Sequence, residues 1–212
     1  MTSALEIADS AVLWSVPAEH RGAALASRPL LVLMHGRGSD ENDLFALTPV
    51  LPPEAVVASL RAPLPLGAAY SWFPVAQPGL PSPHAAADAT MAVLDWLDRV
   101  GHSGPTWLLG FSQGGAMVTQ LLRFDAQRFD KFVNLSGFSI HGELPNDGSL
   151  ETLRPPLFWG RDPADPVIPR DAVERTASWL PGHTTLTKRE YPGVGHSISR
   201  EELDEVNAFL AD

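Results

Sequence analysis

The chain has 212 residues, of which 44% are hydrophobic and 19% charged, a balance typical of a globular protein rather than a disordered one. It contains no cysteine, which excludes disulfides, thiolate metal sites and a cysteine nucleophile. Its net charge of −10 argues against nucleic-acid binding, which requires a basic surface. The length predicts one domain, residues 1–212.

The N-terminal segment has neither the basic start nor the apolar stretch of a signal peptide. No apolar run approaches the roughly 18 residues that a membrane-spanning helix needs, so no stable membrane insertion is expected. A cytoplasmic protein is therefore predicted. Histidine and the acidic residues show no convincing metal-ligand spacing, so we expect neither a metal nor another cofactor. Monomer and homodimer both stay open.

Short apolar runs alternate with amphipathic stretches along the chain. In chain order, the pattern predicts an edge strand or hairpin within 5–14, a strand at 29–35, a helix at 40–51, a strand at 55–60, a helix at 85–100, a strand at 105–111, a helix at 114–124, strands at 131–135 and 156–159, a helix at 171–180, a strand at 184–191 and a helix at 200–210. This alternation predicts an α/β fold with a mainly parallel central sheet, helices on both faces and no large cap domain.

One connection is long for a compact domain. Residues 63–83 contain several prolines together with Trp72 and Phe73. Long connections of this kind are usually functional. We therefore expect this segment to form part of a binding site.

A serine nucleophile is indicated by the sequence G-F-S-Q-G at residues 110–114. The bare G-x-S-x-G pattern also arises by chance, but here it follows an apolar strand and precedes a helix. In that context it is typical of a sharp turn that presents the serine hydroxyl at the end of a sheet. We predict Ser112 as the nucleophile. The backbone N–H of Gln113, at the helix start, is predicted to stabilise an oxyanion.

Three histidines follow Ser112 in the sequence. In folds that carry the nucleophile on this type of turn, the chain order is serine, then the acid, then the histidine base. His196 lies in a glycine-containing loop directly after the strand predicted at 184–191. His183 precedes that strand, at the wrong end of a parallel sheet, and no strand and acidic residue separate His141 from the serine. We predict His196 as the general base; the alternative is a surface-loop histidine.

The orienting carboxylate is expected in the loop after the strand at 156–159, which offers Asp162 and Asp165. Asp165 is the predicted triad member because it lies between the turn and the following helix. Asp162 is then expected to accept backbone N–H groups in the turn. The alternative for either residue is an ordinary turn or N-cap aspartate.

The second oxyanion donor is expected in the loop H-G-R-G-S-D at residues 35–40. Gly36 and Gly38 allow the backbone to approach a reacting carbonyl closely, and the predicted donor is the backbone N–H of Arg37. His35 is expected to form hydrogen bonds within the loop. A phosphate-binding loop is the rival interpretation, but the G-K-[ST] sequence of that motif is absent.

Four segments together resemble the phospholipase/carboxylesterase family of α/β-hydrolases. They are L-M-H-G-R-G-S-D-E-N-D-L at 33–44, G-F-S-Q-G-G at 110–115, D-P-V-I-P at 165–169 and G-x-G-H at 193–196. The family includes acyl-protein thioesterases, lysophospholipase-like enzymes and small bacterial carboxylesterases. The resemblance extends from about Leu30 to the C-terminus and implies that Trp72 and Phe73 lie beside the acyl pocket as substrate-binding residues.

The roles that the resemblance implies agree with those predicted above from the motifs and the chain order. They are Ser112 as nucleophile, Asp165 as acid and His196 as base, with Arg37 and Gln113 as oxyanion donors. Arg37 stands where the eukaryotic thioesterases usually have a hydrophobic residue, which favours the small bacterial members and a small-ester or lysolipid substrate.

The predicted protein is a serine carboxylic-ester hydrolase that forms an acyl-enzyme from a small-molecule ester or thioester substrate. An acyltransferase or peptidase on the same scaffold is the first alternative. A noncatalytic binding protein on a hydrolase fold is the second, although such a protein would be expected to have lost a triad member.

Overall fold

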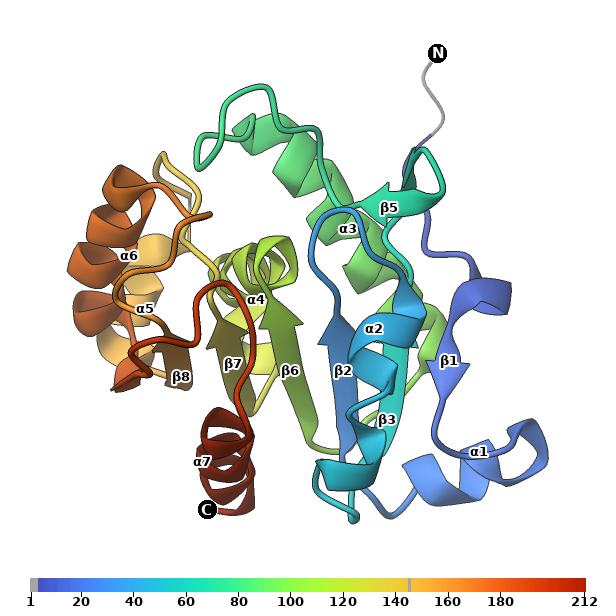
Figure 1. Ribbon diagram of the computed structural model, residues 1–212. Coiled ribbons are helices and arrows are strands. Elements are labelled where there is room, and N and C mark those ends of the chain that lie inside the picture. Colours follow the sequence, from blue (N-terminus) through green and yellow to red (C-terminus); the bar gives the residue numbers. More distant parts are fainter. Residues whose placement is uncertain (1–3, 145) are drawn as a thin grey trace.

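The computed structural model describes residues 4–144 and 146–212 (Figure 1). Its centre is a seven-stranded sheet in the order β1-β3-β2-β6-β7-β8-β9. The strands are β1 (Leu13–Trp14), β2 (Leu30–Met34), β3 (Val56–Leu60), β6 (Thr106–Phe111), β7 (Lys131–Leu135), β8 (Pro156–Arg161) and β9 (Thr185–Glu190). Only β1 runs antiparallel to its neighbour, so the carboxyl ends of the other strands meet at one edge.

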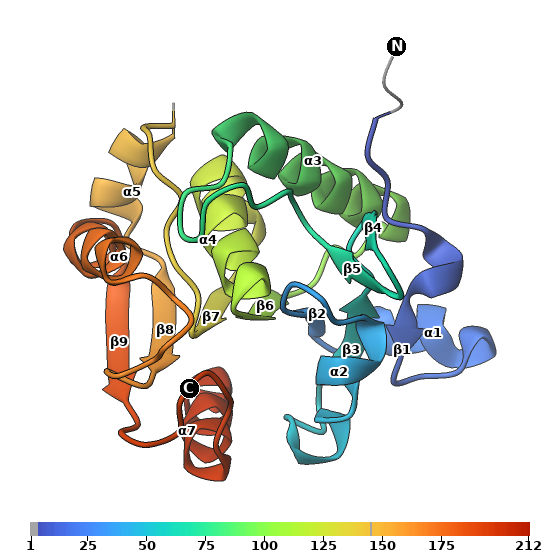
Figure 2. The same ribbon diagram turned by 45° about the horizontal axis from the view of Figure 1, so that its top comes forward.

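Helices cover both faces of the sheet (Figure 2). On one side lie α3 (Pro83–Val100), α4 (Gln113–Asp125), α5 (Asp147–Leu153) and α6 (Arg170–His183), and on the other lie α2 (Glu41–Phe45) and α7 (Arg200–Ala211). β2 is buried along its whole length because alternate side chains enter the two hydrophobic clusters. Continuous apolar runs in the sequence therefore correspond to strands buried on both faces.

The predicted helix at 40–51 is wrong as a continuous element. It is divided into α2 and the short 3-10 helix η2 (Thr48–Val50), with Pro49 in its first turn. Proline lacks the N–H that a continuing helix would donate.

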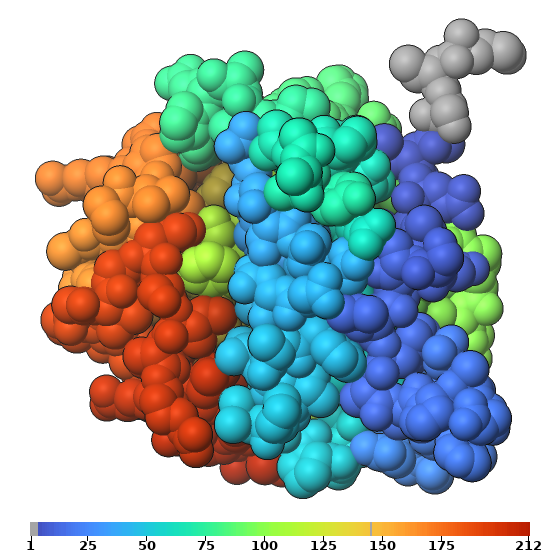
Figure 3. All heavy atoms as spheres, turned by 45° about the vertical axis from the view of Figure 1, so that its right-hand side comes forward, coloured from blue at the N-terminus to red at the C-terminus, as the bar shows by residue number. Residues whose placement is uncertain are grey.

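In the space-filling view of Figure 3, the N-terminal residues, in blue, lie against the light-blue and cyan segment that contains α2 and η2.

Several short elements were not predicted from the sequence. Helix α1 (Ala18–Leu25) and helix α5 are short, and the strands β4 (Leu64–Leu66) and β5 (Ala69–Ser71) form a two-stranded antiparallel hairpin inside the long connection. Residues 5–14 contain the 3-10 helix η1 (Asp9–Ala11) followed by the edge strand β1. The edge strand is confirmed, but it is only two residues long.

Candidate active site

Ser112 lies at the junction of β6 and α4, in a strained backbone conformation with φ 55° and ψ −113°. Positive φ is costly for a residue other than glycine. The turn is closed by two close backbone approaches. A Cβ on Gly110 would lie 2.1 Å from the Gly114 carbonyl oxygen, and one on Gly114 would lie 1.8 Å from the Met34 carbonyl oxygen. Glycine at both positions lets α4 begin directly against β2 and β6.

The side chains of Ser112, His196 and Asp165 form a continuous hydrogen-bonded chain. His196 Nε2 lies 2.9 Å from Ser112 Oγ, and His196 Nδ1 lies 2.7 Å from Asp165 Oδ2. The serine and aspartate follow β6 and β8, and the histidine follows β9, so the carboxyl ends of parallel strands bring them together. A neutral imidazole that donates from Nδ1 to the carboxylate can accept the serine proton at Nε2.

Asp165 is held by its own loop. Its side chain has no exposed surface, and Oδ1 accepts hydrogen bonds from the backbone N–H groups of Val167 at 2.7 Å and Ile168 at 3.2 Å. These bonds leave Oδ2 for His196. The loop therefore fixes the direction in which the carboxylate meets the imidazole.

Asp162 connects the acid loop to the histidine loop. Its Oδ1 accepts from the Ala164 N–H at 2.7 Å, as expected of a turn residue, and its Oδ2 accepts from the Gly195 N–H at 2.6 Å. Hydrogen bonds from the N–H groups of Ala164 and Gly195 lower the pKa of Asp162, because they stabilise its charged form. Gly195 directly precedes His196 in the chain, so this hydrogen bond holds the backbone beside the histidine. The sequence did not predict it.

The loop after β2 lies beside the nucleophile. A Cβ on Gly36 would lie 3.5 Å from Ser112 Cβ, and the following residue, Arg37, lines the same cavity as Ser112 and Gln113. His35 is buried, with Nδ1 2.7 Å from the Gly36 carbonyl oxygen and Nε2 accepting from a backbone N–H. Burial lowers the pKa of His35, which therefore stays neutral and supports the loop.

Trp72 and Phe73 are fully buried and do not line the cavity at Ser112. They bind the side chain of Gln113 instead: the Trp72 N–H donates to Gln113 Oε1 at 2.9 Å, and Gln113 Nε2 donates to the Phe73 carbonyl at 2.8 Å. Ser71 Oγ donates to the same Oε1 at 3.1 Å, and Trp72 Nε1 donates to the His35 carbonyl at 2.8 Å. The segment thus ties Gln113 to the loop after β2, a positioning arrangement rather than the expected contact with substrate.

A cavity of about 320 Å³ opens at Ser112 and His196. Its walls are mostly apolar and come from the long connection, the segment after β7 and the acid loop, including Val75, Pro78, Phe138, Val167 and Ile168. The ring of Phe111 packs against the imidazole of His196, with centroids 4.9 Å apart. His183 lies elsewhere: it stacks on Trp179 at the end of α6. Val75 and Pro78 lie in the 63–83 connection, which was expected to form part of a binding site, and Val167 and Ile168 lie in the D-P-V-I-P segment, but the sequence did not indicate that these four side chains line the cavity.

A model of the phospholipase/carboxylesterase family matches residues 21–212. The chain belongs to this family. Acyl-protein thioesterase 1 of Debaryomyces hansenii is 35% identical to this family member over 106 residues, which are 49% of this chain and 46% of that protein. The aligned part is thus only about half of the thioesterase's length. A probable SOBER1-like carboxylesterase of Arabidopsis thaliana is 27% identical over 226 residues, covering 99% of this chain and 82% of that protein.

Solved structures of esterases share the fold of this family member. A carboxylesterase from Mesorhizobium loti superposes with a TM-score of 0.79 over 99% of both chains at 19% identity. Esterase PE8 superposes with a TM-score of 0.75 over 99% of both chains at 26% identity. The predicted α/β-hydrolase fold and the predicted family are therefore confirmed, and the predicted enzyme class, hydrolysis of ester bonds, is confirmed at the level of the family.

Within residues 4–144 and 146–212, no helix is both long and apolar enough to cross a membrane. No group of histidine and acidic residues in that part of the chain is arranged to hold a metal ion. Cytoplasmic location, oligomeric state and the single domain stay predictions.

Proposed function

We propose that this family member is a serine carboxylic-ester hydrolase that works through Ser112, His196 and Asp165. The chain of hydrogen bonds from Ser112 Oγ through both nitrogens of His196 to Asp165 carries the proposal. A serine hydroxyl is a weak nucleophile until a base removes its proton, and the imidazole is in place to do so. The buried carboxylate holds the imidazole in the required tautomer.

The proposed reaction has two halves. Ser112 Oγ attacks the acyl carbon while its proton moves to His196 Nε2, and Asp165 stabilises the resulting imidazolium. The imidazolium then gives that proton to the departing alcohol or thiol, which leaves an acyl-enzyme. A water molecule then attacks the acyl carbon while His196 Nε2 takes its proton. The bond between the acyl carbon and Ser112 Oγ breaks, His196 returns the proton to Oγ, and the carboxylic acid is released.

Two backbone N–H groups are proposed to stabilise the oxyanion in both halves. Gln113 begins α4, where the aligned peptide dipoles favour negative charge, and Arg37 lies in the loop beside Ser112 Cβ. The buried amide of Gln113, fixed by Ser71, Trp72 and Phe73, holds the first donor in position.

The cavity favours a small-molecule substrate with an apolar acyl group. Its volume of about 320 Å³ lies at the lower end of the range for ligand sites, and its walls contain valine, isoleucine, proline and phenylalanine. A carboxylic ester or a thioester with a short or medium acyl chain fits this description. The names of the relatives, carboxylesterase and acyl-protein thioesterase, support both leaving groups.

The first prediction concerns Ser112→Ala. Hydrolysis of p-nitrophenyl butyrate should fall by about three orders of magnitude or more, because the nucleophile is lost. Ser178→Ala is the matched control, since Ser178 is exposed on α6 and bonds only within its helix. Mass spectrometry after treatment with a fluorophosphonate should show one adduct on the wild type and none on Ser112→Ala. Near-wild-type turnover by the alanine variant would contradict the mechanism.

The same measurements discriminate the alternatives. A chain that labels with the fluorophosphonate but hydrolyses no ester in a panel of acyl lengths would be an acyltransferase or peptidase. A chain that neither labels nor hydrolyses would be a noncatalytic binding protein on a hydrolase fold.

A further inference from the structure

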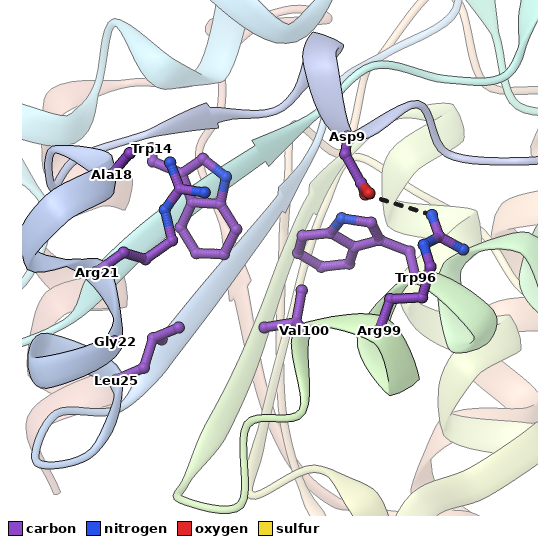
Figure 4. A pocket seen from close by; sticks show the side chains of 9 residues that line it. All are labelled: Asp9, Trp14, Ala18, Arg21, Gly22, Leu25, Trp96, Arg99 and Val100. Atoms are coloured by element: carbon purple, nitrogen blue, oxygen red, sulfur yellow. Dashed lines mark hydrogen bonds and ion pairs between the residues drawn. The ribbon is translucent and has the colours of Figure 1, made fainter.

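A second cavity lies between α1, β1 and α3, and it shares no lining residue with the cavity at Ser112 (Figure 4). Its volume is about 390 Å³, within the range of small-molecule sites. The cavity is on the part of the molecule formed by the antiparallel edge strand, away from the carboxyl ends of β6, β8 and β9 that carry the triad. The proposed hydrolysis makes no use of it.

One wall of this cavity is aromatic and apolar, and the rest is lined by the charged residues Asp9, Arg21 and Arg99. The rings of Trp14, from β1, and Trp96, from α3, lie with centroids 5.9 Å apart and planes inclined by 39°. Leu25 and Val100 complete the apolar part (Figure 4). Trp96 is almost completely buried, whereas Trp14 is half-buried. The half-buried Trp14 presents indole surface that another aromatic ring can contact, and Trp96 packs against the Trp14 ring.

Arg21 brings an uncompensated positive charge to the same cavity. Its guanidinium lies over the Trp14 ring, 4.3 Å from the centroid. Within the described ranges it has no hydrogen-bond or ion-pair partner, and its Nε is buried without an acceptor. Arg99, the other arginine here, is engaged: its Nη2 donates to the Ile7 carbonyl at 2.7 Å and lies 3.4 Å from Asp9 Oδ1.

The contrast between the two arginines indicates the kind of ligand. Arg99 holds the N-terminal segment against α3, so its charge is already balanced. Arg21 lies with its guanidinium over the Trp14 ring, and within the described ranges its N–H donors have no acceptor, which leaves them for a carboxylate. An unpaired cation beside apolar aromatic walls matches a molecule with a flat apolar body and one negative charge.

We propose that this cavity binds a small aromatic carboxylate, with the carboxylate on Arg21 and the ring against Trp14 and Leu25. The site is independent of the proposed hydrolysis, because it uses no residue of the catalytic cavity. A neutral ring would lose the pairing with Arg21, and a carboxylate without a ring would lose the stacking.

The test uses the full chain and the probe 1-naphthoate, with 1-naphthamide as the uncharged analogue. In titrations to about 10 mM followed by NMR, naphthoate should shift the indole N–H signals of Trp14 and Trp96 and leave those of Trp159 and Trp179 in place. The amide should bind at least about tenfold more weakly. No shift of the first two signals, or equal binding of the two probes, would overturn the proposal.

Two variants localise the binding. Arg21→Gln should weaken naphthoate binding by about tenfold or more, whereas Arg170→Gln, an exposed arginine on α6, should not. Gly22→Leu keeps Arg21 and adds a bulky side chain at a residue that lines the cavity; a Cβ at Gly22 would have no heavy atom within 4 Å, so α1 has room where that side chain begins. It should abolish binding while ester hydrolysis stays at the wild-type rate. Unchanged binding in both variants would place the probe elsewhere and refute the site.

Discussion

At the scale of single residues, the candidate site depends on carboxylates with different tasks. Asp165 meets the imidazole, whereas Asp162 holds the backbone of the loop that carries it. Chain order and strand ends were sufficient to propose Ser112, Asp165 and His196, because parallel strands bring their carboxyl ends together. The bond from Gly195 to Asp162 spans 33 residues and depends on loop conformation, which no sequence pattern specifies.

Asp162→Asn tests this positioning role. In Asp162, one carboxylate oxygen accepts from the Ala164 N–H and the other from the Gly195 N–H. Asparagine replaces one of these oxygens by an NH₂ group, which cannot accept and would face one of the two N–H donors. The loop should shift and misplace His196, so kcat for p-nitrophenyl butyrate should fall by about tenfold with little change in KM. Asp171→Asn, at an exposed position of α6, is the control and should behave as wild type. Wild-type kcat in Asp162→Asn would show that the bond to Gly195 is dispensable.

Trp72 and Phe73 show another limit at the residue scale. The long connection that contains them was expected to be functional, and the family resemblance implied that both residues contact substrate. Both are buried, and their backbone groups bind Gln113 instead. Composition indicates that large aromatic side chains matter for packing, but it does not say whether they face the cavity or the interior behind it.

At the scale of elements, the strands and helices with strong apolar patterns were predicted and the short ones were not. Strands β2, β3, β6 and β7 are buried along nearly their whole length, so their composition indicates them directly. Helix α1 has no fully buried residue, and helix α5 buries only Leu150. Without a continuous apolar face such helices leave no period in the sequence, because their stability comes from contacts with the rest of the fold.

The junction between β2 and α4 supports a prediction at this scale. A methyl group at Gly114 would overlap the Met34 carbonyl, a backbone atom that cannot rotate away. Gly114→Ala should therefore displace α4, lower the free energy of unfolding by about 3 kcal/mol or more and impair hydrolysis, as measured by urea denaturation and ester turnover.

Gly148→Ala is the matched control for that variant. Gly148 lies within helix α5, and an added Cβ would have no heavy atom within 4 Å. Alanine is the better helix former, so this variant should be as stable as the wild type or more stable by up to about 1 kcal/mol. Equal stability of Gly114→Ala and Gly148→Ala would contradict the close packing of α4 on β2.

At the scale of the whole molecule, a buried acid couples folding to pH. Glu202, in the first turn of α7, is 1% exposed, and its Oε1 has no hydrogen-bond partner among the described residues. The carboxyl group lies so close to β8 that a Cβ on Gly160 would be 2.2 Å from Oε1. Burial, with a smaller contribution from nearby Glu205, raises the pKa of Glu202 to about 7. The buried hydroxyl of Tyr191 likewise has no hydrogen-bond partner in the part of the chain that the structure describes.

The native state therefore holds this proton to a higher pH than the unfolded chain, whose ordinary glutamate pKa is 4.5. The stabilisation that this proton gives the native state is complete below the unfolded-state pKa of 4.5 and is lost as the pH rises to about 7. The loss between about pH 5.5 and pH 8 should be near 2 kcal/mol, from about 1.4 kcal/mol for each pH unit. Glutamine cannot ionise, so Glu202→Gln should remove this dependence.

Urea denaturation of wild type and Glu202→Gln at both pH values measures the effect, because pH terms from other groups cancel in the difference. The variant should gain about 2 kcal/mol relative to wild type on going from the lower to the higher pH. Glu201→Gln, at an exposed neighbouring position, should show no such change. A difference between wild type and Glu202→Gln that stays constant with pH would mean that the carboxyl group is ionised in the folded protein. Helix α7 directly follows the His196 loop and contacts β8, and Glu202 lies at that contact, against Gly160.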